Sequence, residues 1–310
     1  MGPGGGLTMA AWLDAVVEEE RLLHPGHAAC PGCGPAINMR HVLGALSAAV
    51  PESRIVLVIP ASCWTIIAGA YPVNALGVAV HLTPFASAAA EASAIKAAMR
   101  LRGLGETTVL VWAGDGATSD IGFSGMSAAA DRNEDIVYVL NDNEAYMNTG
   151  VQKSGATPEG AWTTTTPEGA PRIGQKKNVA EIVAAHGVPY VATLAAGTVP
   201  MLRDFRSKVA KAATIPGFRF LHILGACPPG WRYPIAQTVD VTRLAVESNT
   251  FPLWECEDGV WRITYTPRRE VRVGEYLASQ GRFTALKADD VASIQSHVDT
   301  RLRRLKSRCG

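Results

Sequence analysis

The chain has 310 residues, of which 47% are hydrophobic and 18% are charged, so it is long enough to bury the core of one large domain or of two smaller ones. Its 29 basic and 28 acidic residues nearly cancel, which gives no general reason to expect a nucleic acid or an anionic membrane as a partner. The sequence contains no run of about 18 apolar residues that could span a bilayer. Its first residues lack the basic and apolar regions of a secretory signal, so a cytoplasmic location is the default expectation.

Short apolar runs alternate with helical patterns over most of the chain. In chain order, the patterns predict a strand over residues 54–60, a helix over 86–104, a strand over 107–114, a helix over 122–132, a strand over 135–141, helices over 178–186 and 199–213, and a strand over 218–225. Strands that are apolar on both faces suit a parallel sheet buried between layers of helices. We therefore expect an α/β fold built on a doubly wound, mostly parallel sheet.

Two segments differ from this alternation. Residues 144–177 hold a threonine cluster, several glycines and prolines and few large apolar side chains, and a loop of this length in a compact domain usually serves a function or an interface. The sequence after about residue 238 has weaker strand character and predicts helices over residues 273–280 and 288–306. The expected organisation is an N-terminal segment over residues 1–20, a main domain over 21–237, and a C-terminal extension over 238–310 that packs on the domain or on a partner subunit.

The strand predicted over residues 107–114 leads into the sequence Gly114-Asp115-Gly116. In open α/β sheets, ligands bind beyond the carboxyl ends of the strands. Glycines there allow the backbone to approach a phosphate, and an aspartate supplies an oxygen ligand for Mg²⁺, although a plain turn would also carry this sequence. Asn143 follows the next predicted strand, so Asp115, the Asn143 side chain and the backbone carbonyl of Ala145 could hold one cation.

The sequence around these residues resembles a known family. Gly114-Asp115-Gly116 followed by Asn143 resembles the thiamine diphosphate motif of the transketolase and 2-oxoacid decarboxylase superfamily. The β subunits of pyruvate:ferredoxin oxidoreductases are similar to this chain at residues 119–125 (SDIGFSG), 130–133 (ADRN), 142–150 (DNEAYMNTG) and 151–154 (VQKS), with Thr157-Pro and Gly160-Ala close behind. The resemblance extends over about residues 20–235, and it implies a thiamine diphosphate-binding fold of the diphosphate-domain type.

The resemblance also implies which residues contact the cofactor. Asp115, Asn143 and the Ala145 carbonyl would hold Mg²⁺, while Asn148 and Thr149 would lie beside the diphosphate and the reacting end as candidate catalytic residues. The full set implied in cofactor binding is Cys63, Gly114, Asp115, Gly116, Asn143, Ala145, Asn148 and Thr149. Polar side chains such as those of Asn148 and Thr149 could instead simply cap a turn.

Six cysteines in a chain without signs of secretion indicate metal ligands or buried thiols rather than disulfides. Cys30 and Cys33 form the sequence Cys-Pro-Gly-Cys, which on its own is compatible with a redox pair, half of a zinc site or part of an iron–sulfur site. No second pair of this spacing exists, which disfavours a four-cysteine zinc ribbon. A redox dithiol should open a helix after a strand, and no convincing apolar strand precedes Cys30.

Two further cysteines, Cys63 and Cys227, each come shortly after a predicted strand. Their strand ends lie on the same edge of the predicted sheet as Asp115, so four thiolates could converge there on a [4Fe–4S] cluster, which takes four cysteine ligands. An isolated cysteine at either position would be read as a small buried apolar residue. The family pattern agrees with the cluster and assigns as ligands Cys30, Cys33, Cys63 and Cys227.

Three other residues have less defined roles. Cys256 and Cys309 match no ligand position, and we interpret them as incidental thiols. His27, close to the cysteine pair, is either a neighbour of the cluster or the diphosphate, or a hydrogen-bonded structural histidine.

The resemblance implies chemistry that this chain performs only within a complex. The thiamine diphosphate carbanion attacks a 2-oxoacid carbonyl and accepts the electrons left when CO₂ departs; single electrons then pass through the cluster to ferredoxin, and coenzyme A takes the acyl group. In this superfamily the carboxylate that activates the cofactor comes from a pyrimidine-binding domain, for which the chain has no room. We therefore expect three partners: an α subunit that supplies the pyrimidine side, a ferredoxin-like subunit with further clusters, and soluble ferredoxin. The complex is expected to be a dimer of heteromers, and its setting to be anaerobic metabolism.

Pyruvate is the expected substrate, because residues 146–150 and 163–167 look more like pyruvate-type or branched-chain-type subunits than the oxoglutarate type. Trp64, directly after Cys63, departs from the small residue expected in pyruvate enzymes, which leaves oxalate or another unusual 2-oxoacid open. Two other classes also remain. A non-redox thiamine diphosphate decarboxylase subunit would have no use for four cysteines, and a zinc-stabilised binding subunit would not bind thiamine diphosphate.

Overall fold

The structure, a computed structural model, describes residues 22–69, 72–166 and 174–309. The expected N-terminal segment over residues 1–20 lies outside the described residues. Eight strands form one sheet in the order β2-β1-β3-β4-β6-β5-β7-β8. The strands are β1 (Ile55–Pro60), β2 (Ala79–Thr83), β3 (Thr108–Gly114), β4 (Val137–Asp142), β5 (Tyr190–Leu194), β6 (Arg219–Leu224), β7 (Trp254–Glu257) and β8 (Val260–Ile263). The predicted α/β fold with a mostly parallel sheet is confirmed.

The strands from β2 to β5 in this order are parallel, and β7 and β8 are added antiparallel to β5. The apolar runs that predicted β1, β3, β4 and β6 are buried along nearly their whole length, as expected for strands with helices on both faces. The sequence did not reveal β2, β5, β7 and β8. β2 and β8 are the outermost strands of the sheet. β2 is mostly exposed and β8 alternates between exposed and half-buried residues, so neither has a continuous apolar pattern.

The helices predicted from the sequence are all present, with small shifts at their ends. The helices are α2 (Gly34–Ser47), α3 (Cys63–Ile67), α4 (Ala88–Leu101), α5 (Phe123–Asp131), α6 (Val179–Ala184), α7 (Val199–Thr214), α8 (Pro228–Trp231), α9 (Thr238–Glu247), α10 (Val273–Ala278) and α11 (Ala288–Arg308). Shorter turns are η2 (Glu52–Arg54), η3 (Ala117–Ile121), η4 (Ile235–Gln237) and η5 (Gly281–Phe283). The unpredicted helix α2 starts directly after Cys33, with Pro35 in its first turn, where a missing N–H costs nothing.

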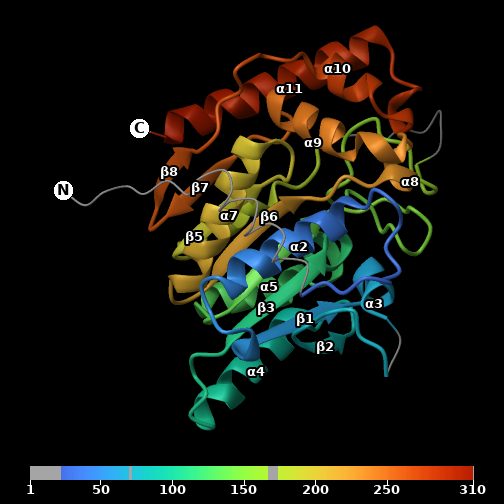
Figure 1. The fold of residues 1–310 in the computed structure, drawn as a ribbon. Helices are drawn as coiled ribbons and strands as arrows, with labels where there is room; N and C mark the ends of the chain where they lie inside the picture. The colour runs from blue at the N-terminus through green and yellow to red at the C-terminus, as the bar shows by residue number, and fades with distance from the viewer. Residues whose placement is uncertain (1–21, 70–71, 167–173, 310) are drawn as a thin grey trace.

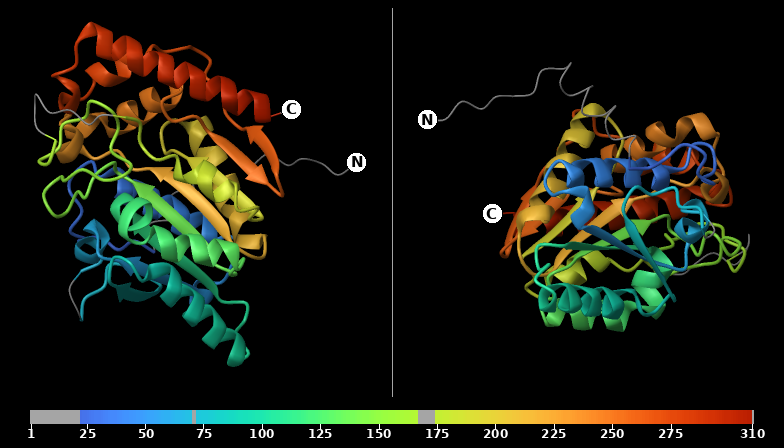
Figure 2. Two further views of the ribbon diagram at one scale, coloured as in Figure 1. Left: turned by 180° about the vertical axis from the view of Figure 1, so that it is seen from behind. Right: turned by 60° about the horizontal axis from the view of Figure 1, so that its bottom comes forward.

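Helices cover both faces of the sheet (Figures 1 and 2). α2 and α7 pack on one face, where Met39 and Phe205 belong to an apolar core shared with the strands. α4, α5 and α6 cover the other face, where Ala92 and Met126 belong to a second core. Both cores exclude water from the sheet, which leaves its ends as the places where polar groups can gather.

The sheet has a topological switch point between β1 and β3. β1 leads to β2 on one side, while its other neighbour β3 leads to β4 on the opposite side. Open α/β sheets bind ligands at such a point, beyond the carboxyl ends of the strands. Because β1, β3, β4 and β6 are parallel, the segments that follow them emerge at one edge of the sheet. The strand-end residues Cys63, Asp115, Asn143 and Cys227 therefore share this edge, as predicted.

The residues after Thr238 contribute both strands and helices. β7 pairs with β5, and α9, α10 and α11 share a third apolar core with α8, which includes Trp231 and Tyr276.

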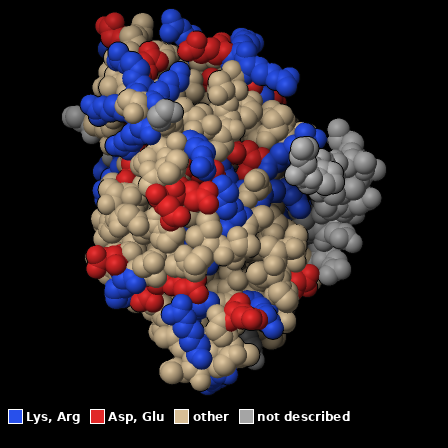
Figure 3. Space-filling model, turned by 90° about the vertical axis from the view of Figure 1, so that its left-hand side faces the viewer, with Lys and Arg blue, Asp and Glu red and all other residues tan. Residues whose placement is uncertain are grey.

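Basic side chains gather where α11 ends, with acidic side chains on the surface below them (Figure 3). No helix in the described part of the chain is long and apolar enough to cross a membrane. The division of the chain at residues 237 and 238 stays a prediction.

Candidate active site

A cavity of about 110 Å³ lies at the carboxyl edge of the sheet, over the switch point. Its walls come from the segments that follow β1, β3 and β4, together with Phe85. The residues predicted to bind the cofactor all line it: Cys63, Gly114, Asp115, Gly116, Asn143, Ala145, Asn148 and Thr149. The structure thus brings the whole predicted set around one cavity, while the role of each residue stays a prediction.

Three oxygen-bearing groups meet in the wall of this cavity. In one orientation of its amide, the side-chain oxygen of Asn143 lies 2.8 Å from the carbonyl oxygen of Ala145 and 3.0 Å from Oδ1 of Asp115. With the amide turned over, its nitrogen donates to both oxygens, which satisfies the group without a cation. Neighbouring oxygens in an octahedral Mg²⁺ shell lie about 3.0 Å apart, because Mg–O distances are about 2.1 Å. The three groups therefore fit Mg²⁺ when the amide oxygen faces inward.

Asp115 is a buried carboxylate, with 1% of its surface exposed. The hydroxyl of Ser154 donates a hydrogen bond to its Oδ2. Burial, and after it the nearby carboxylate of Asp142, raises the pKa of Asp115 well above its usual value. A buried negative charge is costly unless a positive charge compensates it, so the electrostatics of the site also favour a bound cation.

The two glycines that flank Asp115 have different surroundings. A Cβ at Gly116 would collide with the ring of Tyr146, whereas a Cβ at Gly114 would meet no atom within 4 Å and would project into open space. We expect Gly116→Ala to displace Tyr146 and to destabilise the cofactor-free protein by about 1–3 kcal/mol. Gly114→Ala should leave the unfolding temperature unchanged but weaken binding of a diphosphate. Thermal unfolding and diphosphate titration of both variants check this, and equal effects on unfolding would contradict it.

Asn148 and Thr149 lie at the exposed rim of the cavity. The hydroxyl of Thr149 donates to Oε1 of Gln152 at 2.6 Å, and Nε2 of Gln152 donates back to the Thr149 carbonyl at 2.6 Å. These bonds close a turn, so turn capping, the alternative drawn from the sequence, describes Thr149 in this structure. A catalytic role for Asn148 and Thr149 stays a prediction.

The segments that carry the predicted cluster cysteines meet beside the cavity. Cys33 directly precedes α2, Cys63 begins α3, and Cys227 directly precedes α8. The Gly34 amide donates to the Ala226 carbonyl at 3.1 Å, and a Cβ on Gly34 would collide with that backbone. The loop of Cys33 therefore touches the strand end of Cys227, and Cys63 lines the cavity itself.

Electrostatic interactions also group these thiols. Burial raises the pKa of Cys33 to about 12, of Cys63 to about 11 and of Cys227 to about 12, and neighbouring cysteines of the set, including Cys30, add to each increase. A redox-active thiol needs a lowered pKa. Within residues 22–69, 72–166 and 174–309, no three His, Cys, Asp or Glu side chains are close enough to hold one metal ion.

The remaining candidates from the sequence lie in the core or in a local turn. Cys256 is buried in β7, and Cys309 packs against the same core, which lies on the face covered by α4 and α5. Nδ1 of His27 accepts a hydrogen bond from the Ala29 amide at 3.3 Å, which agrees with the structural interpretation of this histidine.

Trp64 does not contribute to the cavity. Its side chain is buried and packs edge-on against Trp112, with ring centroids 5.9 Å apart, and it is absent from the lining of the cavity. The side chain after Cys63 thus lies in the apolar core rather than in the wall of the cavity, and its bearing on the substrate stays a prediction.

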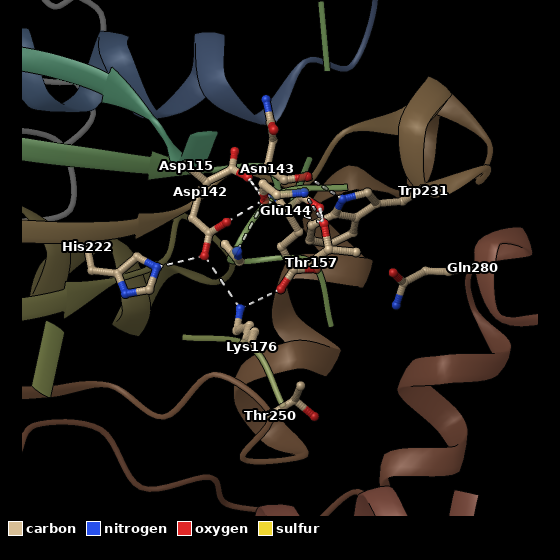
Figure 4. Close-up of polar contacts among 12 residues, drawn as sticks. Asp115, Asp142, Asn143, Glu144, Thr157, Lys176, His222, Trp231, Thr250 and Gln280 are labelled. Carbon is tan, nitrogen blue, oxygen red and sulfur yellow. Dashed lines mark hydrogen bonds and ion pairs between the residues drawn. The ribbon is translucent and has the colours of Figure 1, made fainter. Parts of the chain in front are cut away.

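A buried charged network, which the sequence did not reveal, lies directly behind the oxygen cluster (Figure 4). The carboxylate of Asp142 accepts hydrogen bonds from His222 at 2.8 Å and from Lys176 at 3.4 Å, and Lys176 also bonds Glu144 at 2.6 Å. Burial alone would raise the pKa of Asp142, but Lys176 and His222 outweigh it and lower the pKa to about 2. Asp142 thus stays ionised beside Asp115. The only sequence feature that pointed to Asp142 was its position in the family motif at residues 142–150.

Comparison with known proteins places this site in context. Residues 63–223 match the family described as "Thiamine pyrophosphate enzyme, C-terminal TPP binding domain". The chain is 42% identical over 293 residues to the pyruvate synthase subunit PorB of Methanothermobacter marburgensis, covering 94% of this chain and 99% of that protein. It is also 42% identical over 297 residues to the ketoisovalerate oxidoreductase subunit VorB of Pyrococcus horikoshii, covering 93% of each.

Among solved structures, the 2-oxoglutarate:ferredoxin oxidoreductase of Magnetococcus marinus, solved with 2-oxoglutarate, coenzyme A and succinyl-CoA bound, superimposes with a TM-score of 0.58. The match covers 73% of this chain and 80% of that chain at 21% identity. At this level of identity the match demonstrates a shared fold.

Proposed function

Because this chain belongs to the thiamine pyrophosphate enzymes and is a β subunit of a 2-oxoacid:ferredoxin oxidoreductase, we propose that it holds the Mg²⁺-bound diphosphate of thiamine diphosphate in the cavity at the switch point. The observation that carries the proposal is the convergence of oxygens from Asp115, Asn143 and Ala145 at spacings that suit an octahedral cation. The open space beside Gly114 is where the diphosphate would lie.

The residues of this chain bind and orient rather than react. When bound, thiamine diphosphate supplies a nucleophilic carbon for the 2-oxoacid carbonyl and an electron sink for the loss of CO₂. In our proposal, Asp115 supplies a negatively charged ligand to the cation, while Asn143 and the Ala145 carbonyl fix its position. Asn148 and Thr149, at the rim, would contact the reacting end of the cofactor. The parallel sheet provides the rigid frame that such placement requires.

We further propose that Cys30, Cys33, Cys63 and Cys227 bind a [4Fe–4S] cluster, which supplies a one-electron acceptor. Support comes from the contact between the segments of Cys33 and Cys227 and from the mutual electrostatic influence of the thiols. Because Cys63 lines the cavity, the cluster and the cofactor would be neighbours. Electrons would leave for ferredoxin, and coenzyme A would accept the acyl group.

The relatives are named as subunits, so other subunits complete the enzyme. We propose that an α subunit supplies the pyrimidine side of the cofactor and that a ferredoxin-like subunit carries further clusters, in a dimer of heteromers. The loop over residues 144–177, which borders the cavity at its start, is the proposed contact with the α subunit.

Pyruvate is the proposed substrate, and 2-ketoisovalerate is the second candidate. The second is favoured by a specific observation, because the chain is 42% identical both to a pyruvate synthase subunit and to a ketoisovalerate oxidoreductase subunit.

The proposal is tested by anaerobic viologen reduction with a panel of 2-oxoacids, using the chain alone and co-expressed with its partner subunits. We expect turnover of pyruvate or 2-ketoisovalerate only by the complex, and only with thiamine diphosphate and Mg²⁺, because the chain holds one half of the cofactor. Full turnover by the chain alone would contradict the partner requirement. Decarboxylation without viologen reduction would indicate a non-redox decarboxylase, and zinc content without cofactor binding would indicate a zinc-stabilised subunit.

A further inference from the structure

Glu144 lies between two proposed cation ligands, Asn143 and Ala145, in an uncommon backbone conformation. Its φ is 64°, a left-handed conformation that few residues other than glycine and asparagine adopt. The chain turns here so that the Asn143 side chain and the Ala145 carbonyl approach Asp115. A conformation of this kind persists only where its surroundings hold it.

Four hydrogen bonds hold Glu144 in this conformation. Its amide donates to Oδ1 of Asp142 at 3.0 Å, and its carbonyl accepts from Oγ1 of Thr157 at 2.7 Å. Its buried carboxylate binds Nζ of Lys176 at 2.6 Å through one oxygen and a guanidinium nitrogen of Arg282 at 2.5 Å through the other. Charge-assisted bonds are roughly twice as strong as neutral ones, so the two cations contribute most to holding the turn.

Arg282 comes from the C-terminal segment, in η5, 138 residues after Glu144. Its side chain is 3% exposed, and its guanidinium carbon lies 3.9 Å from the centre of the Trp231 ring. Its Nε donates to Oε1 of Gln280 at 2.9 Å. Stacking on one side and hydrogen bonds at two nitrogens fix the planar guanidinium in one orientation.

Trp231 provides a second connection from Arg282 to the turn. Its Nε1 donates to the carbonyl oxygen of Asn143 at 2.8 Å, as Figure 4 shows. Arg282 therefore restrains the turn directly through Glu144 and indirectly through the ring of Trp231. Trp231 also ends α8, the helix that follows Cys227, so the same arginine borders the segment of a proposed cluster ligand.

We propose that Arg282 is a positioning residue for the cation site, which fixes the turn over residues 143–145 so that its oxygens converge with Asp115. The inference rests on the proposed function of the cavity, and it extends that function by giving the C-terminal segment a part in the site. Arg282 does not line the cavity, so it acts through Glu144 and Trp231. Removing a residue that orients metal ligands typically weakens metal binding about 10- to 100-fold.

The test is binding of Mn²⁺, a paramagnetic substitute for Mg²⁺, followed by the EPR signal of the free ion. The sample is the assembled complex with saturating thiamine diphosphate. Arg282→Met should raise the dissociation constant about 10- to 100-fold. Arg282→Lys keeps the charge but loses the planar stacking, so it should raise the constant by a smaller factor. Because the ligands remain, turnover at saturating Mg²⁺ should approach that of the unaltered protein, while the Mg²⁺ concentration for half-maximal activity rises.

Arg219→Met is the matched control. Arg219 is also 3% exposed and pairs with Asp135. It lies at the start of β6, however, so it is at the amino ends of the parallel strands, away from the cavity at their carboxyl ends. This substitution should lower the unfolding temperature without changing Mn²⁺ binding. A loss of Mn²⁺ affinity in Arg219→Met as large as in Arg282→Met would show that Arg282 acts only through general stability, and would overturn the proposal.

Asp115→Ala separates the inference from the proposed function on which it rests. If Asp115→Ala does not abolish Mn²⁺ binding, the cation site itself is wrong. If it does, but both Arg282 variants bind Mn²⁺ as the unaltered protein does, the cation site stands and the positioning role is overturned. Should Arg282→Met fail to fold, Arg282→Lys alone decides: an unchanged dissociation constant refutes the role, and an increased one supports it.

Discussion

Asp115→Asn is expected to remove thiamine diphosphate from the assembled complex and to abolish viologen reduction by 2-oxoacids. Asp115 is the one carboxylate among the three proposed cation-binding groups, so its loss removes the only negatively charged group of the three that would hold the cation and, through it, the diphosphate. The effect should exceed the roughly 10- to 100-fold loss typical of residues that only support a metal ligand. The two measurements are the thiamine diphosphate retained after desalting and the initial rate of viologen reduction.

Asp131→Asn is the control for this substitution. Asp131 is an exposed residue at the end of α5, so removal of its charge should leave both cofactor content and rate unchanged. If the Asp115 variant retained as much cofactor as the Asp131 variant, Asp115 would not hold the cation.

Asp115→Asn should also stabilise the cofactor-free protein. Burial, and after it Asp142, raises the pKa of Asp115 well above its usual value, so the ionised carboxylate opposes folding at neutral pH. A raised pKa in the folded state means that this cost is absent at low pH and grows as pH rises above the usual carboxyl pKa of about 4. The free energy of unfolding gained by Asp115→Asn should therefore be larger at pH about 8 than at pH about 5, as urea unfolding would measure. A gain that shrinks as pH rises would contradict this.

Replacement of Cys227 by alanine is expected to remove the proposed [4Fe–4S] cluster and with it electron transfer to an external acceptor. A [4Fe–4S] cluster takes four cysteine ligands, and the segment of Cys227 contacts that of Cys33 just before α8 begins. Iron content and absorbance at about 400 nm, a region where iron–sulfur proteins absorb, should fall sharply in the anaerobically purified complex. Cofactor content should fall much less, because Asp115 and its partners remain.

Cys256→Ala is the matched control, since Cys256 is likewise buried but lies in β7 within an apolar core. It should reduce stability slightly and leave iron content unchanged. Equal iron content in the Cys227 and Cys256 variants would exclude Cys227 as a ligand.

The core of the fold was predictable from sequence because its signals are local, and so was the gathering of the candidate site residues around one cavity. Continuous apolar runs marked β1, β3, β4 and β6, and parallel strands direct their succeeding segments to one edge of the sheet. That rule alone places Cys63, Asp115, Asn143 and Cys227 together. It did not predict β2, which is short and mostly exposed, or the pairing of β7 with β5.

The supports of the site could not be predicted, because they depend on packing between distant segments. Arg282 and Glu144 are 138 residues apart, and His222 and Asp142 are 80 apart; neither pair has a signature in spacing or periodicity. The direction of the Trp64 side chain could not be predicted either, because it follows the turn of α3 into the core rather than facing the cavity.

The proximity of thiamine diphosphate and the cluster is tested most directly by adding a 2-oxoacid to the anaerobic complex and following the cluster absorbance at about 400 nm. If the two groups are neighbours at this sheet edge, pyruvate or 2-ketoisovalerate should bleach the band. The bleaching should require thiamine diphosphate and Mg²⁺, and it should be lost in the Asp115→Asn complex even though that complex keeps its iron. Release of CO₂ with an unchanged band would contradict electron transfer from the cofactor to the cluster.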